Sequence, residues 1–247
     1  MADMITHNLR AWEREKAVNM FSEDALQAPE QAIFNMLPLA SMSVLDIGIG
    51  AGRTTHYLAS RCKHYIGVDY SAPMIEAAKQ QFPSIALHVA DARSLPFQEH
   101  FDFILFSFNG IDNMPHEDRI TTLNEIKKSL KPGGYFAFSS HNIFGAKKLF
   151  HIQWNRKPRR MIESAKRWYK TRTRNPSWST IITKDNVVIN EGAHALNLQQ
   201  YYIKPKAQIE QLSSCGFTNI RVLDLEGAKL QDPYTSEDNW IYYLCTG

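Results

Sequence analysis

The sequence has few cysteines, no long apolar run and no repeated segment. Its three cysteines, Cys62, Cys215 and Cys245, lie far apart and form no Cys-x-x-Cys pair, so we expect reduced thiols and no bound metal. No segment approaches the ~18 consecutive apolar residues that a membrane-spanning helix needs. The first 14 residues mix charged and apolar side chains and lack the apolar stretch of a secretory signal. These absences favour a cytoplasmic protein.

The composition is that of a globular protein. Hydrophobic residues make up 44% and charged residues 21% of the 247 positions. This length allows either one α/β domain with an insertion or two small domains.

A glycine-rich segment, residues 44–54, has the pattern of a buried strand, a tight turn and the start of a helix. Gly48, Gly50 and Gly52 allow the backbone to turn sharply and to approach a ligand closely. The N–H groups at the start of the helix favour a ligand that carries negative charge. A dinucleotide-binding loop, Gly-x-Gly-x-x-Gly, would need glycine at position 53, where this sequence has Arg53. A dinucleotide-dependent oxidoreductase is therefore the less favoured alternative.

Strand and helix patterns alternate from this loop onward. We expect strands at residues 43–47, 64–69, 85–90, 101–107 and 135–140, and helices that begin near positions 53, 71 and 117. Such alternation implies a parallel sheet with right-handed crossovers. Asp69 ends the second strand 19 residues after Gly50, the interval at which a carboxylate reaches the ribose hydroxyls of a bound adenosine.

Five motifs resemble, in order and spacing, the successive motifs of class I S-adenosylmethionine-dependent methyltransferases. They are residues 44–53, 67–71, 90–92, 101–103 and 130–134, and the resemblance resumes in a helix and two strands after residue 204. One departure is Ile49, where small or polar residues are common in the family. The resemblance implies an α/β, Rossmann-like fold, with a seven-stranded, mostly parallel sheet, an antiparallel last strand, helices on both faces and an insertion after strand five.

We accordingly predict one methyltransferase domain spanning residues 1–247. Its expected parts are a helical cap (1–40), a cofactor-binding core (41–142), an insertion or lid (143–203) and the C-terminal part of the sheet (204–247).

The resemblance also implies S-adenosylmethionine as cofactor. In this interpretation Arg53 pairs with the cofactor's carboxylate, Asp69 holds the ribose diol, and Tyr70 and Met74 pack on the adenine. Asp46 either contacts the ligand or organises the loop through backbone bonds. The expected cofactor-binding residues are Asp46, Gly48, Gly50, Gly52, Arg53, Asp69, Tyr70, Met74, Asp91, Ala92 and Ser107.

Methyl transfer from a sulfonium depends mainly on aligning the nucleophile with the methyl group, and a base is needed only if the nucleophile must lose a proton. We expect catalytic candidates at the carboxyl ends of strands four and five, and our set is His141, Asn109 and Tyr202. His141 is the best general base by its residue type and location, although a histidine at a strand end is often only structural. We expect His141 and Tyr201 or Tyr202 to face the methyl group from opposite sides of one pocket.

The insertion concentrates positive charge. Residues 147–174 contain eleven Lys and Arg residues and one acid, Glu163, whereas the rest of the chain has 17 basic and 24 acidic residues. The pattern predicts one or two basic amphipathic helices broken near Pro158, followed by a strand pair at residues 187–189 and 196–203.

Three interpretations of this charge stay open: a solvated helical face, a pocket for an anionic small molecule, and contact with RNA or an anionic membrane surface. An RNA-type amino methyltransferase would usually have an Asn/Asp-Pro-Pro-aromatic run after strand four, and residues 107–110 are Ser-Phe-Asn-Gly. We therefore favour methyl transfer to oxygen or nitrogen of a small-molecule or glycan-like acceptor.

Overall fold

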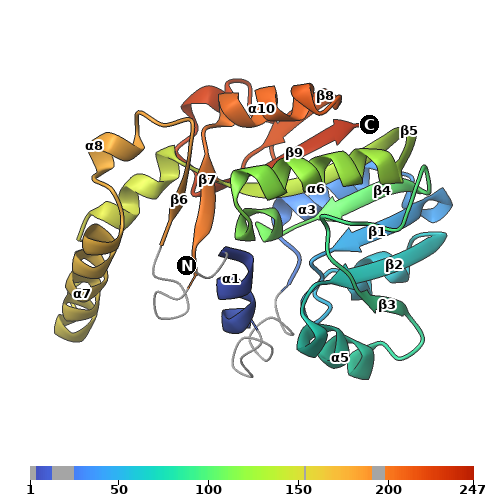
Figure 1. The fold of residues 1–247 in the computed structure, drawn as a ribbon, viewed down its shortest axis with the longest axis horizontal. Helices are drawn as coiled ribbons and strands as arrows, with labels where there is room; N and C mark the ends of the chain where they lie inside the picture. The colour runs from blue at the N-terminus through green and yellow to red at the C-terminus, as the bar shows by residue number, and fades with distance from the viewer. Residues whose placement is uncertain (1–3, 13–24, 153, 191–197) are drawn as a thin grey trace.

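A central, mostly parallel sheet organises the molecule (Figure 1). The computed structural model describes residues 4–12, 25–152, 154–190 and 198–247. Five parallel strands lie in the order β3-β2-β1-β4-β5. Their bounds are β1 Ser43–Ile47, β2 His64–Asp69, β3 Ala86–Val89, β4 Phe101–Phe106 and β5 Leu130–Asn142. The strands expected in this half of the sequence are confirmed, and β5 begins earlier because residues 130–134 extend it.

The C-terminal part completes the sheet as the resemblance implied. Helix α10 (Pro205–Ser214) leads into β8 (Thr218–Leu223), and β9 (Trp240–Thr246) runs antiparallel between β5 and β8. This arrangement confirms the expected Rossmann-like fold with an antiparallel last strand.

The sheet has nine strands among the described residues, two more than expected, because the insertion adds a hairpin to it. Strands β6 (Asn186–Ile189) and β7 (Gln200–Ile203) pair with each other, and β7 pairs with the end of β5. His141 pairs with Tyr202 of β7 and also with Trp240 of β9. Since a strand has one neighbour on each side, β7 lies on the β4 side of β5, beyond the point where β4 ends. Residues 191–197, which include part of the second expected strand, lie outside the described residues.

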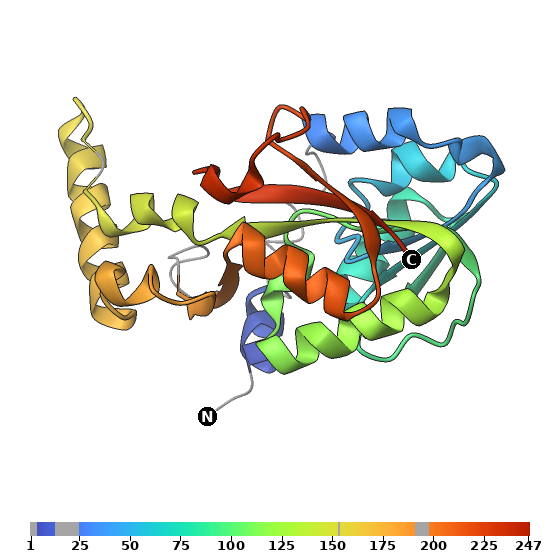
Figure 2. The same cartoon turned by 90° about the horizontal axis from the view of Figure 1, so that it is seen from above.

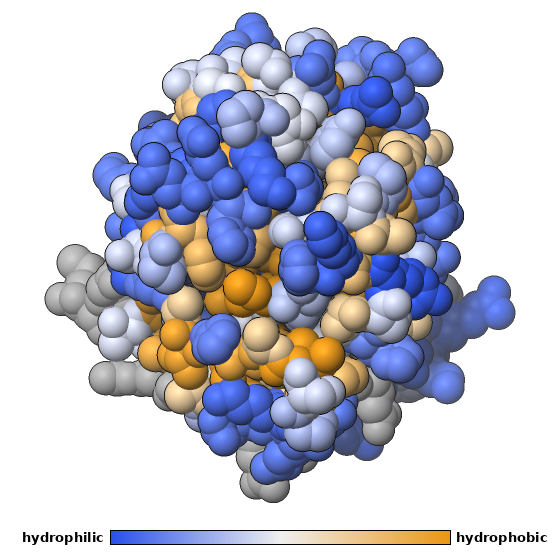
Figure 3. Space-filling model, turned by 90° about the vertical axis from the view of Figure 1, so that its right-hand side faces the viewer, coloured by the Kyte–Doolittle hydropathy of each residue, from blue (hydrophilic) through white to orange (hydrophobic). Residues whose placement is uncertain are grey.

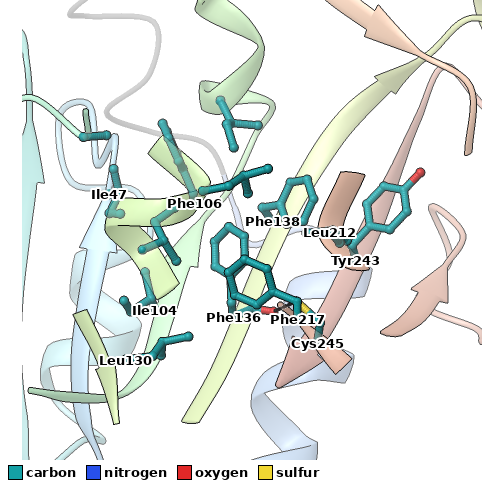
Figure 4. Close-up of a cluster of buried hydrophobic side chains, with 14 of the residues drawn as sticks. Ile47, Ile104, Phe106, Leu130, Phe136, Phe138, Leu212, Phe217, Tyr243 and Cys245 are labelled. Carbon is teal, nitrogen blue, oxygen red and sulfur yellow. Dashed lines mark hydrogen bonds between the residues drawn. The ribbon is translucent and has the colours of Figure 1, made fainter. Parts of the chain in front are cut away.

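Helices cover both faces of the sheet (Figure 2). Helices α6 (His116–Ser129) and α10 lie on one face, and α3 (Ala28–Met36) and α4 (Thr55–Ala59) lie on the other. Successive strand residues point to opposite faces, so Ile104 and Phe106 join the core under α6, whereas Phe103 and Leu105 join the core under α3. Figure 4 shows the first of these clusters, in which Phe136 and Phe138 stack between the sheet and α10. The remaining helices are α1 Met4–Trp12, η1 Leu39–Ser41, α5 Ala72–Gln81, η2 Gly110–Asn113, η3 Phe144–Phe150, α7 Pro158–Arg174, α8 Trp178–Ile181 and η4 Pro233–Thr235.

The two ends of the sheet differ in shape. Helix α7 projects from the end toward which the strands β1, β2 and β4 run (Figure 1). It begins at Pro158, near which the pattern predicted a break between helices. The opposite end, seen in Figure 3, is compact, with apolar residues gathered centrally and hydrophilic residues around them. No helix in the described part of the chain is long and apolar enough to cross a membrane.

Candidate cofactor and active site

A pocket that is open to solvent lies at the carboxyl ends of β1, β2 and β4. Parallel α/β sheets bind ligands at this edge. The lining includes all the expected cofactor-binding residues except Gly52: Asp46, Gly48, Gly50, Arg53, Asp69, Tyr70, Met74, Asp91, Ala92 and Ser107. The structure therefore brings these side chains together around one cavity.

The glycine loop fits close contact with a ligand at one position in particular. Gly50 has a φ of +56°, and a Cβ built there would meet no other atom within 4 Å. The left-handed backbone itself favours glycine here, and the open space beside Gly50 leaves room for a ligand to approach the backbone. Gly52 is different, because a Cβ there would lie 2.6 Å from the Phe82 ring. Its role in the structure is to let the loop pack on Phe82.

The Asp69 carboxylate links the loop to the end of β2. Its Oδ2 accepts the Gly50 N–H at 2.9 Å and its Oδ1 accepts the Ser71 N–H at 2.8 Å. The side chain lies against the pocket, and its burial raises the pKa of the carboxyl group to about 6. A carboxylate oxygen has lone pairs beyond one such bond, so Asp69 can also accept from ligand hydroxyl groups.

Asp46 lies beneath the same loop. Its Oδ2 accepts hydrogen bonds from the Thr54 hydroxyl at 2.5 Å and from the Tyr65 hydroxyl at 2.9 Å. Burial raises the pKa of this carboxyl group to about 7, although both hydrogen bonds oppose the rise. Asp46 therefore ties the loop to helix α4 and strand β2 while it also lines the pocket.

Arg53 has a protein partner that the sequence did not indicate. Its guanidinium donates to both carboxylate oxygens of Glu30 in α3, at 2.7 and 2.5 Å. Glu30 is fully buried and also accepts from the hydroxyls of Ser107 and Tyr242. The Arg53 guanidinium further lies 5.0 Å from the centre of the Phe108 ring. Glu30 therefore neutralises the one basic side chain among the described residues that line the pocket.

A buried polar network holds His141. Its Nδ1 lies 2.8 Å from Asp112 Oδ2, and its Nε2 lies 3.3 Å from Asn109 Nδ2. Asp112 also pairs with Arg119 at 2.5 Å, and neither of these two side chains is exposed. An acceptor at Nδ1 favours the tautomer with its proton there and its lone pair on Nε2. The expected histidine is thus oriented by an aspartate, whose partnership with His141 no local sequence pattern showed.

Tyr202 lies beside His141, with 4.7 Å between the ring centres. Because the two residues are paired in adjacent strands, their side chains point to the same face of the sheet. This placement corrects the expectation that they face a pocket from opposite sides. Tyr201 points away and its hydroxyl lies 2.7 Å from His116 Nδ1. None of Asn109, His141 and Tyr202 is among the described residues that line the pocket.

Helix α1 covers the side of the pocket near η2. Ile5 lines the cavity, and the buried Asn8 donates to the carbonyls of Asn113 at 3.2 Å and Gln199 at 2.7 Å. The Gln199 N–H donates back to Asn8 Oδ1 at 3.0 Å. One asparagine therefore joins the N-terminal helix, η2 and the start of β7.

Comparisons with known proteins agree with this geometry. The family described as a methyltransferase domain matches residues 44–134. Demethylmenaquinone methyltransferase of Staphylococcus saprophyticus is 37% identical over 97 residues, which are 36% of this chain and 40% of the relative. Trans-aconitate 2-methyltransferase of Methylobacterium nodulans is 31% identical over 117 residues, which are 46% of this chain and 44% of the relative. The chain thus matches less than half the length of these relatives.

Two solved structures share the fold over nearly the whole chain. An S-adenosylmethionine-dependent methyltransferase from Mesorhizobium loti has a TM-score of 0.64 at 17% identity, covering 89% of this chain and 98% of its own. The N-methyltransferase NodS of Bradyrhizobium japonicum, solved with S-adenosyl-L-homocysteine, has a TM-score of 0.58 at 16% identity and covers 99% of both chains. Residues 44–134 thus match a methyltransferase domain, and the fold of the chain is similar to that of S-adenosylmethionine-dependent methyltransferases of known structure.

Proposed function

We propose that the protein transfers the methyl group of S-adenosylmethionine to an oxygen or nitrogen atom of a small organic acceptor. The observation that carries this proposal is the joint placement of the open Gly50 backbone and the Asp69 carboxylate on one pocket wall. When bound, the cofactor supplies an electrophilic methyl group on a positively charged sulfur. The names of the relatives above, which refer to a demethylated quinone and to aconitate, support a small-molecule acceptor.

Different residues of the chain would bind different parts of the cofactor. Asp69 would accept hydrogen bonds from the ribose hydroxyls, and Gly48 and Gly50 would let the backbone lie close to the ligand. Met74 and Ala92 offer apolar contact for the adenine, and both are buried in the pocket wall. With Arg53 held by Glu30, the pocket has no unneutralised basic group among its described lining residues. The pocket lining therefore gives no separate support for a strongly anionic acceptor.

His141 would take the proton from an acceptor that must lose one. Asp112 fixes the ring so that Nε2 carries the lone pair, and Asn109 Nδ2 lies next to this nitrogen. Tyr202 packs on the ring and limits its rotation. Because His141 does not line the cofactor pocket, it would act on an acceptor bound beside that pocket, and Asp112, Asn109 and Tyr202 would position it.

Titration calorimetry with S-adenosylmethionine and with NADH tests the proposal. We expect micromolar-range affinity for S-adenosylmethionine and no binding of NADH, and binding of NADH alone would refute the assignment. His141→Gln should lower kcat while the dissociation constant for the cofactor stays within about twofold. If the variant instead loses cofactor affinity, His141 belongs to the cofactor site and has no base role.

A further inference from the structure

The insertion places its charge on a projecting arm. We call residues 147–174, apart from 153, the basic arm; it consists of the end of η3, helix α7 and their connection. Helix α7 stands away from the sheet in both ribbon views (Figures 1 and 2). Arg159, for example, has 93% of its side chain exposed, and its ionic partner Glu163 is the one acid in the arm. The arm therefore presents a dense positive charge to its surroundings.

Large apolar side chains are exposed on the same arm. Nine large hydrophobic residues are exposed in the described part of the chain, and four of them lie between residues 152 and 169. They are Ile152, Trp154, Ile162 and Tyr169, which are 46%, 74%, 56% and 64% exposed. This concentration is unusual, because the arm is also the most charged part of the sequence.

The four exposed apolar side chains are not the ones through which α7 packs on the rest of the molecule. The inner face of α7 packs through Trp168, whose Nε1 donates to the Phe150 carbonyl at 3.1 Å, and through the buried Thr171. Ile162 and Tyr169 are seven residues apart, two turns along the helix, and so share its outer side. Lys166 lies between them in sequence and is exposed as well. The outer side of α7 thus alternates apolar and basic groups.

Each simpler explanation of the arm leaves part of this surface unexplained. A face that is only solvated has no need of four exposed large hydrophobic side chains. An anionic small molecule needs a concave site, and no residue of the arm is among the described lining of the pocket. A nucleic acid would use the charge and could stack on Trp154 and Tyr169, but it has no use for aliphatic Ile152 and Ile162.

An anionic lipid surface matches both properties. Amphipathic basic helices lie in the interface with apolar side chains among the acyl chains and Lys and Arg at the headgroups. Tryptophan and tyrosine side chains favour the same interfacial depth. We propose that the basic arm binds the surface of a bilayer that contains anionic phospholipid. This inference goes beyond the proposed methyl transfer and does not depend on it.

The connection of the arm to the sheet gives this binding a consequence. β5 ends at Asn142, one residue after His141, and runs directly into η3 and then α7. A bound arm would therefore hold the carboxyl edge of the sheet, with its pocket, near the membrane.

Co-sedimentation of the full chain with lipid vesicles tests the proposal. We expect binding to vesicles of phosphatidylcholine and phosphatidylglycerol, little binding to phosphatidylcholine alone, and weaker binding as salt screens the charge. Replacing four basic residues of the arm should lower the partition coefficient about a thousandfold, because each contributes independently to attraction at the surface. The variant carries Arg159→Gln, Arg160→Gln, Arg167→Gln and Lys170→Gln.

A second variant and a matched control separate the apolar part from the charge. Trp154→Ala with Ile162→Ala should weaken binding even though the net charge is unchanged. The control removes four exposed lysines elsewhere and should bind vesicles within about twofold of the original chain, since general charge loss is the same but the arm is intact. Its substitutions are Lys79→Gln, Lys128→Gln, Lys206→Gln and Lys229→Gln.

Absence of vesicle binding, or equal loss in the control and the arm variant, would overturn the proposal. So would displacement of the bound chain from vesicles by a short single-stranded RNA at lower concentration than the lipid, since the arm would then prefer nucleic acid. Calorimetry with S-adenosylmethionine on the same samples keeps the two proposals apart. A chain that binds vesicles but not the cofactor would refute the proposed function alone.

Discussion

Arginine side chains have opposite environments in the two charged regions of this molecule. Near the pocket, Arg53 and Arg119 are buried, and each is paired with a buried carboxylate, Glu30 or Asp112. In the basic arm, the corresponding pair of Arg159 and Glu163 is 3.4 Å apart and largely exposed. Buried pairs fix geometry because losing one partner leaves a charge without solvent, whereas exposed pairs contribute little to stability. Charge therefore holds the site together in one region and remains available for binding in the other.

The largest effect should come from a buried arginine. Arg119 donates to Asp112, Ser140 and Gln208, so Arg119→Met leaves the Asp112 carboxylate buried without its cation. We expect the free energy of unfolding to fall by about 3–5 kcal/mol. Urea unfolding followed by circular dichroism measures this, with Arg159→Met in the arm as the control expected to leave stability unchanged. Similar losses in both variants would remove the distinction between the two regions.

The second-largest effect should be the loss of cofactor affinity in Asp69→Asn. The substitution keeps the shape of the side chain but removes the charge that would strengthen hydrogen bonds from the ribose, so binding of S-adenosylmethionine should weaken by ~2 kcal/mol. Calorimetry measures the change. Asp102→Asn is the matched control: this aspartate lies in β4, accepts the Ser43 N–H at 2.8 Å and pairs with Lys131, away from the pocket. An equal loss in the control would show that Asp69 acts only through the fold.

The same carboxylate should make cofactor affinity depend on pH. Burial raises the pKa of Asp69 to about 6, so the group becomes protonated as the pH falls through 6 and then accepts fewer hydrogen bonds. We expect affinity to be full above this value and to fall by up to about tenfold per pH unit below it, since one pKa unit corresponds to ~1.4 kcal/mol. Calorimetry from pH 5 to 8 gives the profile. Asp69→Asn should flatten it, and Asp46→Asn should retain it; the reverse would assign the titration to Asp46.

Much of the fold was predictable because local sequence patterns specify its strands and helices. Apolar strands and helix starts recur at the βα interval, so the strands from Ser43 to Asn142 followed from spacing, whereas the expected site residues followed from the family resemblance. The pairing of β7 with the end of β5 did not follow. That contact depends on where a long insertion returns in space, and the periodicity of β7 itself carries no information on its neighbour.

The hydrogen-bond partners of the site residues also could not be predicted from the sequence. Glu30 and Arg53 are 23 residues apart and meet only because α3 packs on the face of the sheet beside the loop. Asp112 lies in η2, after β4, whereas His141 lies near the end of β5, so no local sequence pattern pairs them. Sequence spacing located the individual side chains near one edge, whereas their hydrogen-bond partners required the tertiary structure.

The smallest expected effect is on cofactor affinity when the arm loses charge. None of the substituted residues Arg159, Arg160, Arg167 and Lys170 is among the described lining of the pocket, and α7 projects away from it (Figure 1). Exposed charges act over a Debye length of ~8–10 Å at moderate salt, and S-adenosylmethionine carries a net positive charge near neutral pH that the arm does not attract. Glutamine at all four positions should therefore change the dissociation constant by no more than about twofold, or ~0.4 kcal/mol. Calorimetry at 50 and 300 mM salt measures this dissociation constant, and Asp69→Asn provides the reference for a variant that does lose cofactor affinity. A large loss of affinity in the arm variant would mean that the arm folds over the adenosine, so that cofactor binding and arm charge belong to one region instead of two.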